Sequence, residues 1–476
     1  MKKILVLIAL LLAVMPALAD TTPEQERALV DKVYKELPVM SESLDYIIKN
    51  YVDEDKIKGD LLFHGAIKGM ISTLDVHSHF MDLDQFNELQ TETSGVFGGI
   101  GVEITLRSDI LTIVAPIEKS PAWQQGIRSG DRIIKIEGEL TKGKTVDDAI
   151  KKIRGPKGTK VKLSIAHEGE DQLVEVEITR DNIKIQSVDS YILSDNFGYI
   201  RLRNFIESSG RDIGAALEKL EKANVRGVIL DLRGNPGGLL DVSVDIADRF
   251  LSGDKLIVYT QGRISSMNRK YTSTGGGSFG EKVPLIVMVN KGSASASEIV
   301  TGALQDNKRA VVMGTQSFGK ASVQSIFRLS DGSGLRLTTA YYYTPLGRKI
   351  HEKGITPDII SEDKFPGDQV WRLNYFEHFA NYAKKYIKAN PTADEKVKVE
   401  DKMVDDMIKD AKAAGFVISD LEIEKNRSFL KSFIRAELIK VLKGDQESEK
   451  ARVEDDDTVK RALDIFKSAE IMNVAK

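Results

Sequence analysis

The chain has no cysteine among its 476 residues, and this absence removes several classes of chemistry at once. Without thiols there is no cysteine nucleophile, disulfide framework, iron–sulfur cluster or zinc ribbon. Glycine and proline, at 38 and 12 residues, are too few for a collagen-like or low-complexity protein. Hydrophobic residues make up 41% of the chain, which is enough for packed cores. At roughly 150 residues per domain, the length predicts about three domains.

Histidine is scarce, and neither sign of charge is in clear excess. The six histidines are scattered, so we expect no large metal cluster, and no metal or other cofactor. His77 and His79 form the one close pair; helix-end capping and packing is the main interpretation, and metal binding is the alternative. With 68 basic and 71 acidic residues, the chain offers no general basic surface for nucleic acid.

Long hydrophobic runs are missing apart from one at the start of the chain. Ile4 to Val14 is an unbroken apolar run, preceded by Lys2-Lys3 and too short to cross a bilayer comfortably. Small residues follow at Ala17-Leu18-Ala19, which predicts a bacterial secretory signal peptide over residues 1–19. An uncleaved N-terminal anchor is the alternative. An exported chain without cysteine fits the periplasm of a Gram-negative cell.

Hydrophobic periodicity divides the rest of the chain into four regions. Residues 20–92 carry apolar residues at spacings of three and four, which predicts helices. Residues 93–182 alternate short β-branched runs with glycine turns and predict a small strand-rich domain. Residues 183–362 alternate apolar strands and helices, which predicts a largely parallel, covered sheet. Residues 363–476 return to charged, amphipathic helix.

Within these regions several elements are expected at definite positions. A strand at Leu285–Val289 is expected to precede a helix at Ala296–Asp306. Long antiparallel strands are expected at Val323–Leu329 and Gly334–Tyr343. The stretch Lys443–Thr458 is so highly charged that we expect it to be loose.

Small residues dominate the segment between that strand and helix, Asn290–Glu298. They allow a sharp turn and the close approach of a substrate backbone. A serine at this point sits at a helix N-terminus, where free backbone N–H groups can hold an oxyanion. A serine that only caps the helix is an equal alternative.

Two further segments supply chemistry that a serine nucleophile needs. Lys320, in Gly319–Gln324, can act as a base if burial lowers its pKa to about 7–8, although a solvated lysine is the simpler interpretation. The glycine-rich turn Asp231–Leu239 can supply exposed amides to an oxyanion. A phosphate loop is disfavoured because no Lys-Ser/Thr follows the glycines, and a plain tight turn is the remaining alternative.

Together, these segments resemble those of the carboxy-terminal processing (tail-specific) peptidases. The matching stretches are DLRGNPGGLL, NKGSASASEIVTGALQD, FGKASVQ and, downstream, TTAYYYTPLGR. Gly98-Gly-Ile-Gly101 and the stretch SPAWQQGIRSGDRIIKI resemble a PDZ domain. Leu74–His79 resembles the family's LDPHS element, with Val76 where proline is usual. The resemblance covers residues 40–360 and leaves the C-terminal tail unassigned.

The resemblance implies a serine–lysine dyad. It assigns the nucleophile to Ser295, the middle serine of the S-A-S-A-S run, and the base to Lys320. Gln324 matches the residue that orients the lysine, and the amides of Gly238 and Ala296 match the oxyanion donors.

Other residues of the same segment keep alternative or supporting roles. Ser293 and Ser297 remain alternatives for the nucleophile, and Glu298 is expected to support the site through a hydrogen bond. The implied fold is an α/β protease core with a mixed, crotonase-like or ClpP-like ββα sheet. A β-rich PDZ domain is inserted in it, and α-helical flanks lie at both ends.

The PDZ resemblance adds a way to select substrates, because PDZ domains bind a peptide as an added strand and capture its carboxylate with loop amides. The carboxylate loop is expected at four residues, Gly99, Ile100, Gly101 and Val102. An apolar pocket using Val102, Ile104 and Ile150 would prefer an apolar last residue. Arg154 is expected to signal peptide occupancy to the protease core, and a solvated arginine is the alternative.

The sequence therefore predicts a periplasmic serine endopeptidase that recognises and cleaves near protein C-termini. Its expected partners are proteins or peptides with free, apolar C-termini, further copies of the chain that associate through the helical flanks, and an adaptor protein. The alternative is a PDZ scaffold or adaptor that binds C-termini without cutting them.

Overall fold

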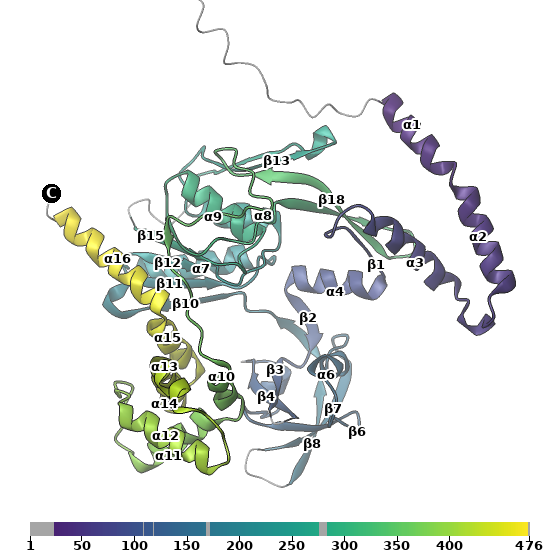
Figure 1. Ribbon diagram of the computed structural model, residues 1–476. Helices are drawn as coiled ribbons and strands as arrows, with labels where there is room; N and C mark the ends of the chain where they lie inside the picture. Colours follow the sequence, from purple (N-terminus) through teal and green to yellow (C-terminus); the bar gives the residue numbers. More distant parts are fainter. Residues whose placement is uncertain (1–22, 108, 118, 168–171, 276–282, 475–476) are drawn as a thin grey trace, which may run out of the picture.

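The computed structural model describes residues 23–107, 109–117, 119–167, 172–275 and 283–474 (Figure 1). The predicted signal peptide lies outside the described residues. Along the part of the chain that is described, no helix is both long enough and apolar enough to cross a membrane.

Helices form the N-terminal part of the chain. They are α1 (Pro23–Tyr34), α2 (Leu37–Asn50), α3 (Gly59–Ser72) and α4 (Leu83–Ser94). The first two project away from the rest of the molecule (Figure 1). Every residue from 24 to 43 is exposed, and α2 has no buried residue. The apolar stripe that the periodicity predicts is therefore present but uncovered in a single chain.

A small β-rich domain follows. Its elements are β3 (Val102–Arg107), β4 (Ile110–Pro116), α5 (Pro121–Gln124), β5 (Arg132–Ile136), β6 (Glu139–Leu140), α6 (Val146–Ile153), β7 (Lys160–Ala166) and β8 (Leu173–Thr179). The strand order β3-β4-β5-β7-β8 leaves β3 at an edge of the sheet. An antiparallel pair, β2 (Val96–Gly99) and β9 (Asp181–Lys184), brackets the domain where the chain enters and leaves it.

A six-stranded sheet forms the centre of the next region. Its strands are, in spatial order, β10 (Val188–Ile192), β11 (Gly198–Leu202), β12 (Val228–Asp231), β15 (Leu285–Val289), β16 (Val311–Gly314) and β19 (Ile359–Ile360). All neighbours are parallel except β10 and β11. The predicted, largely parallel sheet is therefore present.

Helices cover both faces of this sheet, as continuous apolar strands require. Leu230 and Val287 pack with α7 (Ser209–Lys222), α8 (Leu240–Asp248) and α9 (Ala296–Asp306). Because side chains alternate along a strand, Ile229 and Ile286 face the other side. There they pack against α16 (Asp457–Val474), at the far C-terminal end of the chain (Figure 1).

A second sheet joins distant parts of the chain. It contains β1 (His79–Met81), β13 (Leu256–Gly262), β14 (Lys270–Thr272), β17 (Ser322–Arg328) and β18 (Gly334–Tyr343). As predicted, β17 and β18 are long antiparallel neighbours. β1 pairs with the opposite edge of β18, which brings the N-terminal region against the strands that follow Lys320.

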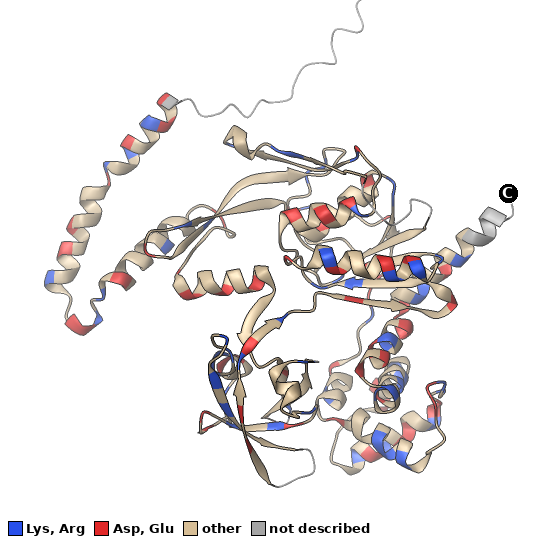
Figure 2. Ribbon diagram, turned by 180° about the vertical axis from the view of Figure 1, so that it is seen from behind, with Lys and Arg blue, Asp and Glu red and all other residues tan. Residues whose placement is uncertain are grey.

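The C-terminal region is a helical bundle. It consists of α10 (Asp368–Tyr375), α11 (His378–Ala389), α12 (Asp401–Ala413), α13 (Asp420–Lys425), α14 (Arg427–Lys443) and α15 (Asp445–Asp455). An ion pair between Arg107 and Glu377 joins it to β3 of the small domain. Basic and acidic residues alternate along its helices, and neither sign dominates the face in Figure 2.

The prediction of a loose segment at Lys443–Thr458 is wrong, because most of it forms α15. This helix packs on α14 through the buried residues Ser448 and Ala451. The Ser448 hydroxyl donates to the Ala436 carbonyl at 2.8 Å. The segment therefore buries its small residues, and some of its charged residues, such as Glu454 and Asp455, form ion pairs with Arg435 of α14.

Candidate active site

Ser295 lies at a strained turn between β15 and α9. Its backbone has φ 54° and ψ −114°, a conformation that residues other than glycine rarely adopt. The turn places Ser295 at the helix N-terminus, where the first N–H groups of α9 have no intrahelical acceptors. Local strain of this kind clusters at active sites because the surrounding structure must hold it in place.

The neighbouring serines are engaged elsewhere. Ser293 and Ser297 are fully buried. Their hydroxyls donate to the carbonyls of Leu232 and Asn235, at 2.8 and 2.9 Å. Both serines therefore connect the turn before α9 (residues 290–298) to the glycine-rich turn (residues 231–239). Because their hydroxyls are occupied in this way, Ser295 is favoured over either of them as the nucleophile.

A single buried carboxylate joins the segments of Ser295 and Lys320. Glu298 Oε2 accepts the amides of Ser295 and Lys320, both at 2.9 Å. Its Oε1 accepts the Ser317 hydroxyl at 2.6 Å and the Gly319 amide at 2.7 Å. Burial raises the pKa of Glu298, and the four donors oppose that rise. Glu298 thus connects the segment of Ser295 to the segment of Lys320 through hydrogen bonds.

Tyr342 provides a second connection that the sequence did not reveal. It is 2% exposed, and its hydroxyl lies 3.0 Å from the Ser295 carbonyl and also within hydrogen-bonding distance of the Lys320 carbonyl. Burial raises the pKa of Tyr342 well above its usual range, so the hydroxyl keeps its proton for donation. The only sequence signal was the aromatic run of the TTAYYYTPLGR stretch.

The environment of Lys320 makes its ammonium group easier to deprotonate. Burial lowers the pKa of Lys320, and the positive charge of Arg336 on β18 lowers it further. The pKa of His77 is also lowered, first by burial and then by the charge of Lys320, so the two residues lie within electrostatic range. A lysine that loses its proton more readily is the kind of base a serine nucleophile needs.

The turn that contains His77 is capped by a carboxylate. Asp75 accepts the amides of His77 and Ser78, at 2.7 and 2.9 Å. Thr338 of β18 donates its amide to the Ser78 hydroxyl at 3.1 Å, which docks the turn on the second sheet. Across the described residues, no three His, Cys, Asp or Glu side chains form a candidate metal site.

Gln324 forms hydrogen bonds with residues other than Lys320 in the described part of the chain. Its amide nitrogen donates to the Ser322 hydroxyl at 2.8 Å and lies 3.5 Å from the Thr338 hydroxyl.

Of the two expected oxyanion donors, Ala296 follows Ser295 in the chain and Gly238 follows Gly237 in the glycine-rich turn. Gly238 and Ala296 donate no recorded backbone hydrogen bond within the described residues. Gly237 lies against the nucleophile turn, since a Cβ there would be 2.8 Å from the Ser295 Cβ and 2.9 Å from the Ala296 nitrogen. Only glycine fits this approach, so the glycine-rich turn lies directly against the backbone around Ser295.

A pocket in the small domain contains most of the predicted peptide-binding residues. It has a volume of about 220 Å³ and is lined by residues that include Ile100, Gly101, Val102, Ile104 and Ile150. The amides of Ile100 and Gly101 donate no recorded backbone hydrogen bond in the described residues. Arg154 also lines the pocket, and its guanidinium lies over the Phe97 ring at 4.4 Å.

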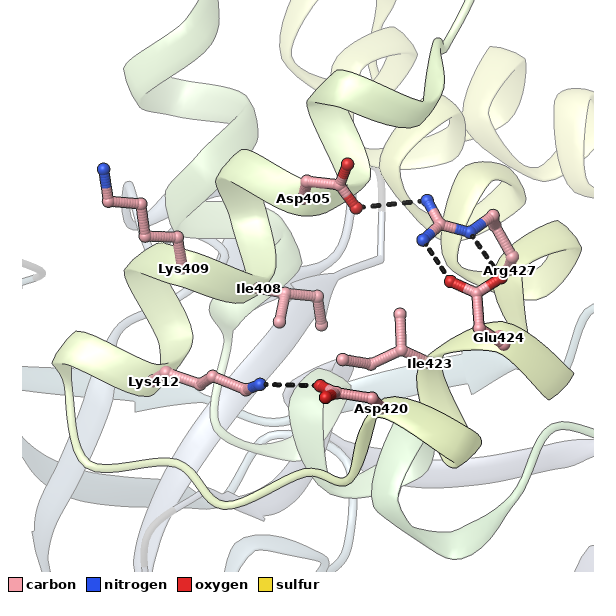
Figure 3. Close-up of a pocket in the computed structure, with 8 residues that line it drawn as sticks. All are labelled: Asp405, Ile408, Lys409, Lys412, Asp420, Ile423, Glu424 and Arg427. Carbon is pink, nitrogen blue, oxygen red and sulfur yellow. Dashed lines mark hydrogen bonds and ion pairs between the residues drawn. The ribbon is translucent and has the colours of Figure 1, made fainter.

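A second pocket, of about 340 Å³, lies in the C-terminal bundle (Figure 3). Five of its six charged lining residues form ion pairs with one another. Arg427 pairs with Asp405 at 3.1 Å and with Glu424 at 2.5 Å, and Lys412 pairs with Asp420 at 3.2 Å. It contains none of the residues of the proposed dyad.

Comparison with known proteins identifies both domains. Residues 196–361 match the model of peptidase family S41, and residues 112–166 match that of the PDZ domain. The chain is 42% identical over 340 residues to a carboxy-terminal-processing protease of Bartonella bacilliformis, covering 70% of this chain and 76% of that protein. A carboxyl-terminal-processing protease of Synechocystis is 40% identical over 304 residues, covering 62% and 70%.

Solved structures are also similar. The photosystem II D1 C-terminal processing protease matches with 28% identity and a TM-score of 0.40, covering 69% of this chain and 93% of that one. The PDZ domain of a carboxy-terminal protease from Vibrio cholerae, solved with a peptide, is 36% identical with a TM-score of 0.18, covering 19% and 99%. The sequence matches are sufficient for assignment: the chain belongs to peptidase family S41, as a carboxy-terminal processing serine protease with a PDZ domain.

Proposed function

We propose that this protease is a periplasmic endopeptidase that recognises substrate C-termini through its PDZ domain and cleaves through a Ser295–Lys320 dyad. The observation that carries the proposal is the pair of hydrogen bonds from the Ser295 and Lys320 amides to one carboxylate oxygen of Glu298. Two residues distant in sequence are thereby kept together. The turn at Ser295 and the lowered pKa of Lys320 give one the geometry of a nucleophile and the other the character of a base.

The mechanism is acyl transfer. Neutral Lys320 accepts the Ser295 hydroxyl proton as Oγ attacks the scissile carbonyl, and the amides of Gly238 and Ala296 bind the oxyanion. Lys320 then protonates the leaving amine, and water hydrolyses the acyl-enzyme. Each oxyanion donor contributes about 2.7–4 kcal/mol to transition-state stabilisation. Gln324 would have to turn from Ser322 toward Lys320 in order to orient it, and this movement is part of the proposal.

The proposed domains follow the sequence. Residues 20–92 form an N-terminal helical flank, 93–182 the PDZ domain, 183–362 the protease core and 363–476 a C-terminal helical flank. The β2–β9 pair at the ends of the second range supports its boundaries. Strands followed by turns and helices in the core support the crotonase-like or ClpP-like ββα description.

We propose that residues 1–19 direct export to the periplasm of a Gram-negative cell and are then removed. The charged start, short apolar run and small residues before Asp20 support this proposal.

We further propose that the helical flanks mediate self-association, with an adaptor protein as a possible second partner. The support is the uncovered apolar stripe on α1 and α2. Leu29, Val33 and Leu37 are 53%, 56% and 53% exposed, and such stripes are normally buried against another surface. A second copy of the arm would cover this stripe.

In the PDZ domain, an apolar C-terminal side chain would occupy the pocket between β3 and α6, and the amides of Gly99, Ile100, Gly101 and Val102 would bind its carboxylate. The free amides of Ile100 and Gly101 and the apolar lining of the pocket support this assignment.

Replacing Arg154 with alanine is expected to lower proteolysis while leaving peptide affinity almost unchanged. Arg154 lies at the end of α6 and stacks on Phe97 of β2, the strand that joins α4 to the PDZ domain and pairs with β9, which leads on to the core. Arg154 can therefore respond to a bound peptide and also contact the β2–β9 pair, which connects the PDZ domain to the core. Fluorescence anisotropy of a labelled peptide and cleavage of an unfolded substrate measure the two effects. Unchanged cleavage would contradict a signalling role.

The test of the function is covalent labelling during proteolysis. The chain lacking residues 1–19 should cleave an unfolded protein that ends in an apolar residue, and cleave it more slowly when that C-terminus is amidated. A fluorophosphonate should stop cleavage, and mass mapping should find the added group on Ser295. A label on another residue would mean that Ser295 is not the nucleophile. Peptide binding with neither cleavage nor label would support the scaffold alternative.

A further inference from the structure

The glycine-rich turn, residues 231–239, contains an arginine that pairs with three carboxylates. Arg233 is 9% exposed and pairs with Asp231, two residues earlier, at 2.7 Å. It also pairs with Asp363 at 2.8 Å and with Asp456 at 2.9 Å. The last two carboxylates come from beyond residue 361, where the match to the peptidase family ends. The C-terminal region therefore contacts the glycine-rich turn directly, at Arg233.

Asp363 also holds the nucleophile turn. Its Oδ2 accepts the Asn290 side-chain amide at 2.8 Å, and its Oδ1 accepts Arg233. Asn290 Oδ1 in turn accepts the amides of Gly234 and Gly292, each at 2.9 Å. The glycine-rich turn (residues 231–239) and the turn before α9 (residues 290–298) are thus fixed to the same carboxylate, each through a different oxygen.

Asp456 has two separate tasks, one for each oxygen. Its Oδ1 accepts the amides of Thr458 and Val459, at 2.8 and 3.1 Å, and so caps the start of α16. Its Oδ2 accepts Arg233 at 2.9 Å. Because α16 packs against the central sheet, with Phe466 stacked on Phe197 at 5.2 Å, the start of the helix is held in place. The helix thereby delivers a fixed carboxylate to Arg233.

We propose that Asp456 is a positioning residue for the oxyanion site and that the C-terminal region takes part in catalysis through its contact with Arg233. This inference rests on the function proposed above. Gly234 and Gly237 have φ of +69° and +104°, and the buried side chain of Asn235 holds the middle of the turn by donating to the Leu202 carbonyl and accepting the Gly237 amide. Arg233 fixes the start of the same turn, and oxyanion donors must lie within about 0.5 Å of their working position.

Two substitutions separate the two tasks of Asp456. Asp456→Ser keeps a good helix cap but is too short to reach Arg233, whereas Asp456→Asn keeps both the cap and the reach and loses only the charge. A charge-assisted hydrogen bond to a buried group is lost in the serine variant, so we expect kcat to fall about tenfold. KM should not change, and the asparagine variant should lie between the serine variant and the parent.

The measurements use the full mature chain, with each rate divided by the fraction of sites that a fluorophosphonate labels. Asp457→Ser is the matched control. Asp457 follows Asp456 in the chain, but its carboxylate is exposed and pairs with Lys364 at 3.0 Å instead of with the glycine-rich turn. Amide hydrogen exchange over residues 233–239 gives a second readout that does not depend on turnover. We expect faster exchange in Asp456→Ser than in the parent or Asp457→Ser.

The outcomes distinguish this inference from the function on which it rests. Loss of labelled sites and of thermal stability, with unchanged kcat per labelled site and unchanged exchange, would show a purely structural role and overturn the inference. An equal loss of kcat in Asp457→Ser would overturn it as well. Absence of any label at Ser295 in the parent would instead contradict the proposed function, and unchanged exchange in Asp456→Ser would then also reject the positioning role.

Discussion

Alanine at Ser295 or at Lys320 is expected to reduce kcat/KM for an unfolded substrate by about a thousandfold or more. The first substitution removes the nucleophile, and the second removes the group that accepts its proton. The double variant should be little worse than either single variant, because residues that act as one unit do not contribute additively. Rates of substrate disappearance, followed by mass spectrometry, measure all three losses.

The folded state of these variants can be verified independently. Neither side chain supplies the ties to Glu298, which come from the backbone amides and survive alanine substitution. Peptide binding by the PDZ domain should therefore persist in both variants. Lys349→Ala is the matched lysine control. The Lys349 side chain is exposed and lies over the ring of Tyr341, a residue of β18. Loss of cleavage in this control would point to a general effect of removing positive charge.

The pH dependence tests the role of Lys320 more sharply. Burial and the charge of Arg336 lower the pKa of Lys320, so its active neutral fraction grows as the pH rises through that lowered value. We expect kcat/KM to rise with pH over the same interval. Arg336→Gln removes a repulsive charge, so it should raise the pKa of Lys320 and move the rising limb to higher pH. A limb that does not move in this variant would contradict the assignment of Lys320 as the base.

Elements with strong local patterns were predictable from the sequence. The strand Leu285–Val289 is an unbroken apolar run, and the helix Ala296–Asp306 follows small residues that permit a sharp turn; both have the predicted bounds. Helix α7 was missed because Gly210 and Gly214 weaken its helical pattern. These glycines face side chains of the neighbouring helix: a Cβ at Gly210 would lie 1.9 Å from a carboxylate oxygen of Asp245 on α8, which would have to move aside. Local propensity cannot register such a close contact between helices.

The site shows the same division between local and distant information. Ser295 and Lys320 occur in short segments that resemble a known family, so sequence alone was enough to nominate them. Asp456 contacts Arg233 across more than two hundred residues of chain, in a charged stretch that local pattern assigns to a loose segment. Tyr342 likewise reaches the site only because β18 pairs with β17. Contacts set by sheet register and helix docking have no signature in a single sequence.

Gly237→Ala is expected to reduce kcat by about a hundredfold to a thousandfold, the loss typical of a disabled oxyanion donor. The added Cβ would lie 2.7 Å from the Ala294 carbonyl oxygen and 2.8 Å from the Ser295 Cβ. These atoms belong to the nucleophile turn and cannot move aside as the end of a flexible side chain can. The glycine-rich turn must therefore shift, and this shift moves the Gly238 amide away from the oxyanion.

Gly234→Ala separates this contact from backbone strain. Gly234 has φ +69° and belongs to the same turn, but a Cβ there meets nothing within 4 Å. This variant should lose stability by about 1–2 kcal/mol, the cost of a left-handed residue, and retain most of its kcat. Steady-state kinetics and thermal melts on both variants distinguish the two effects. Equal kcat losses would mean that the turn responds to strain alone, and that the close approach of Gly237 to Ser295 has no special part in the reaction.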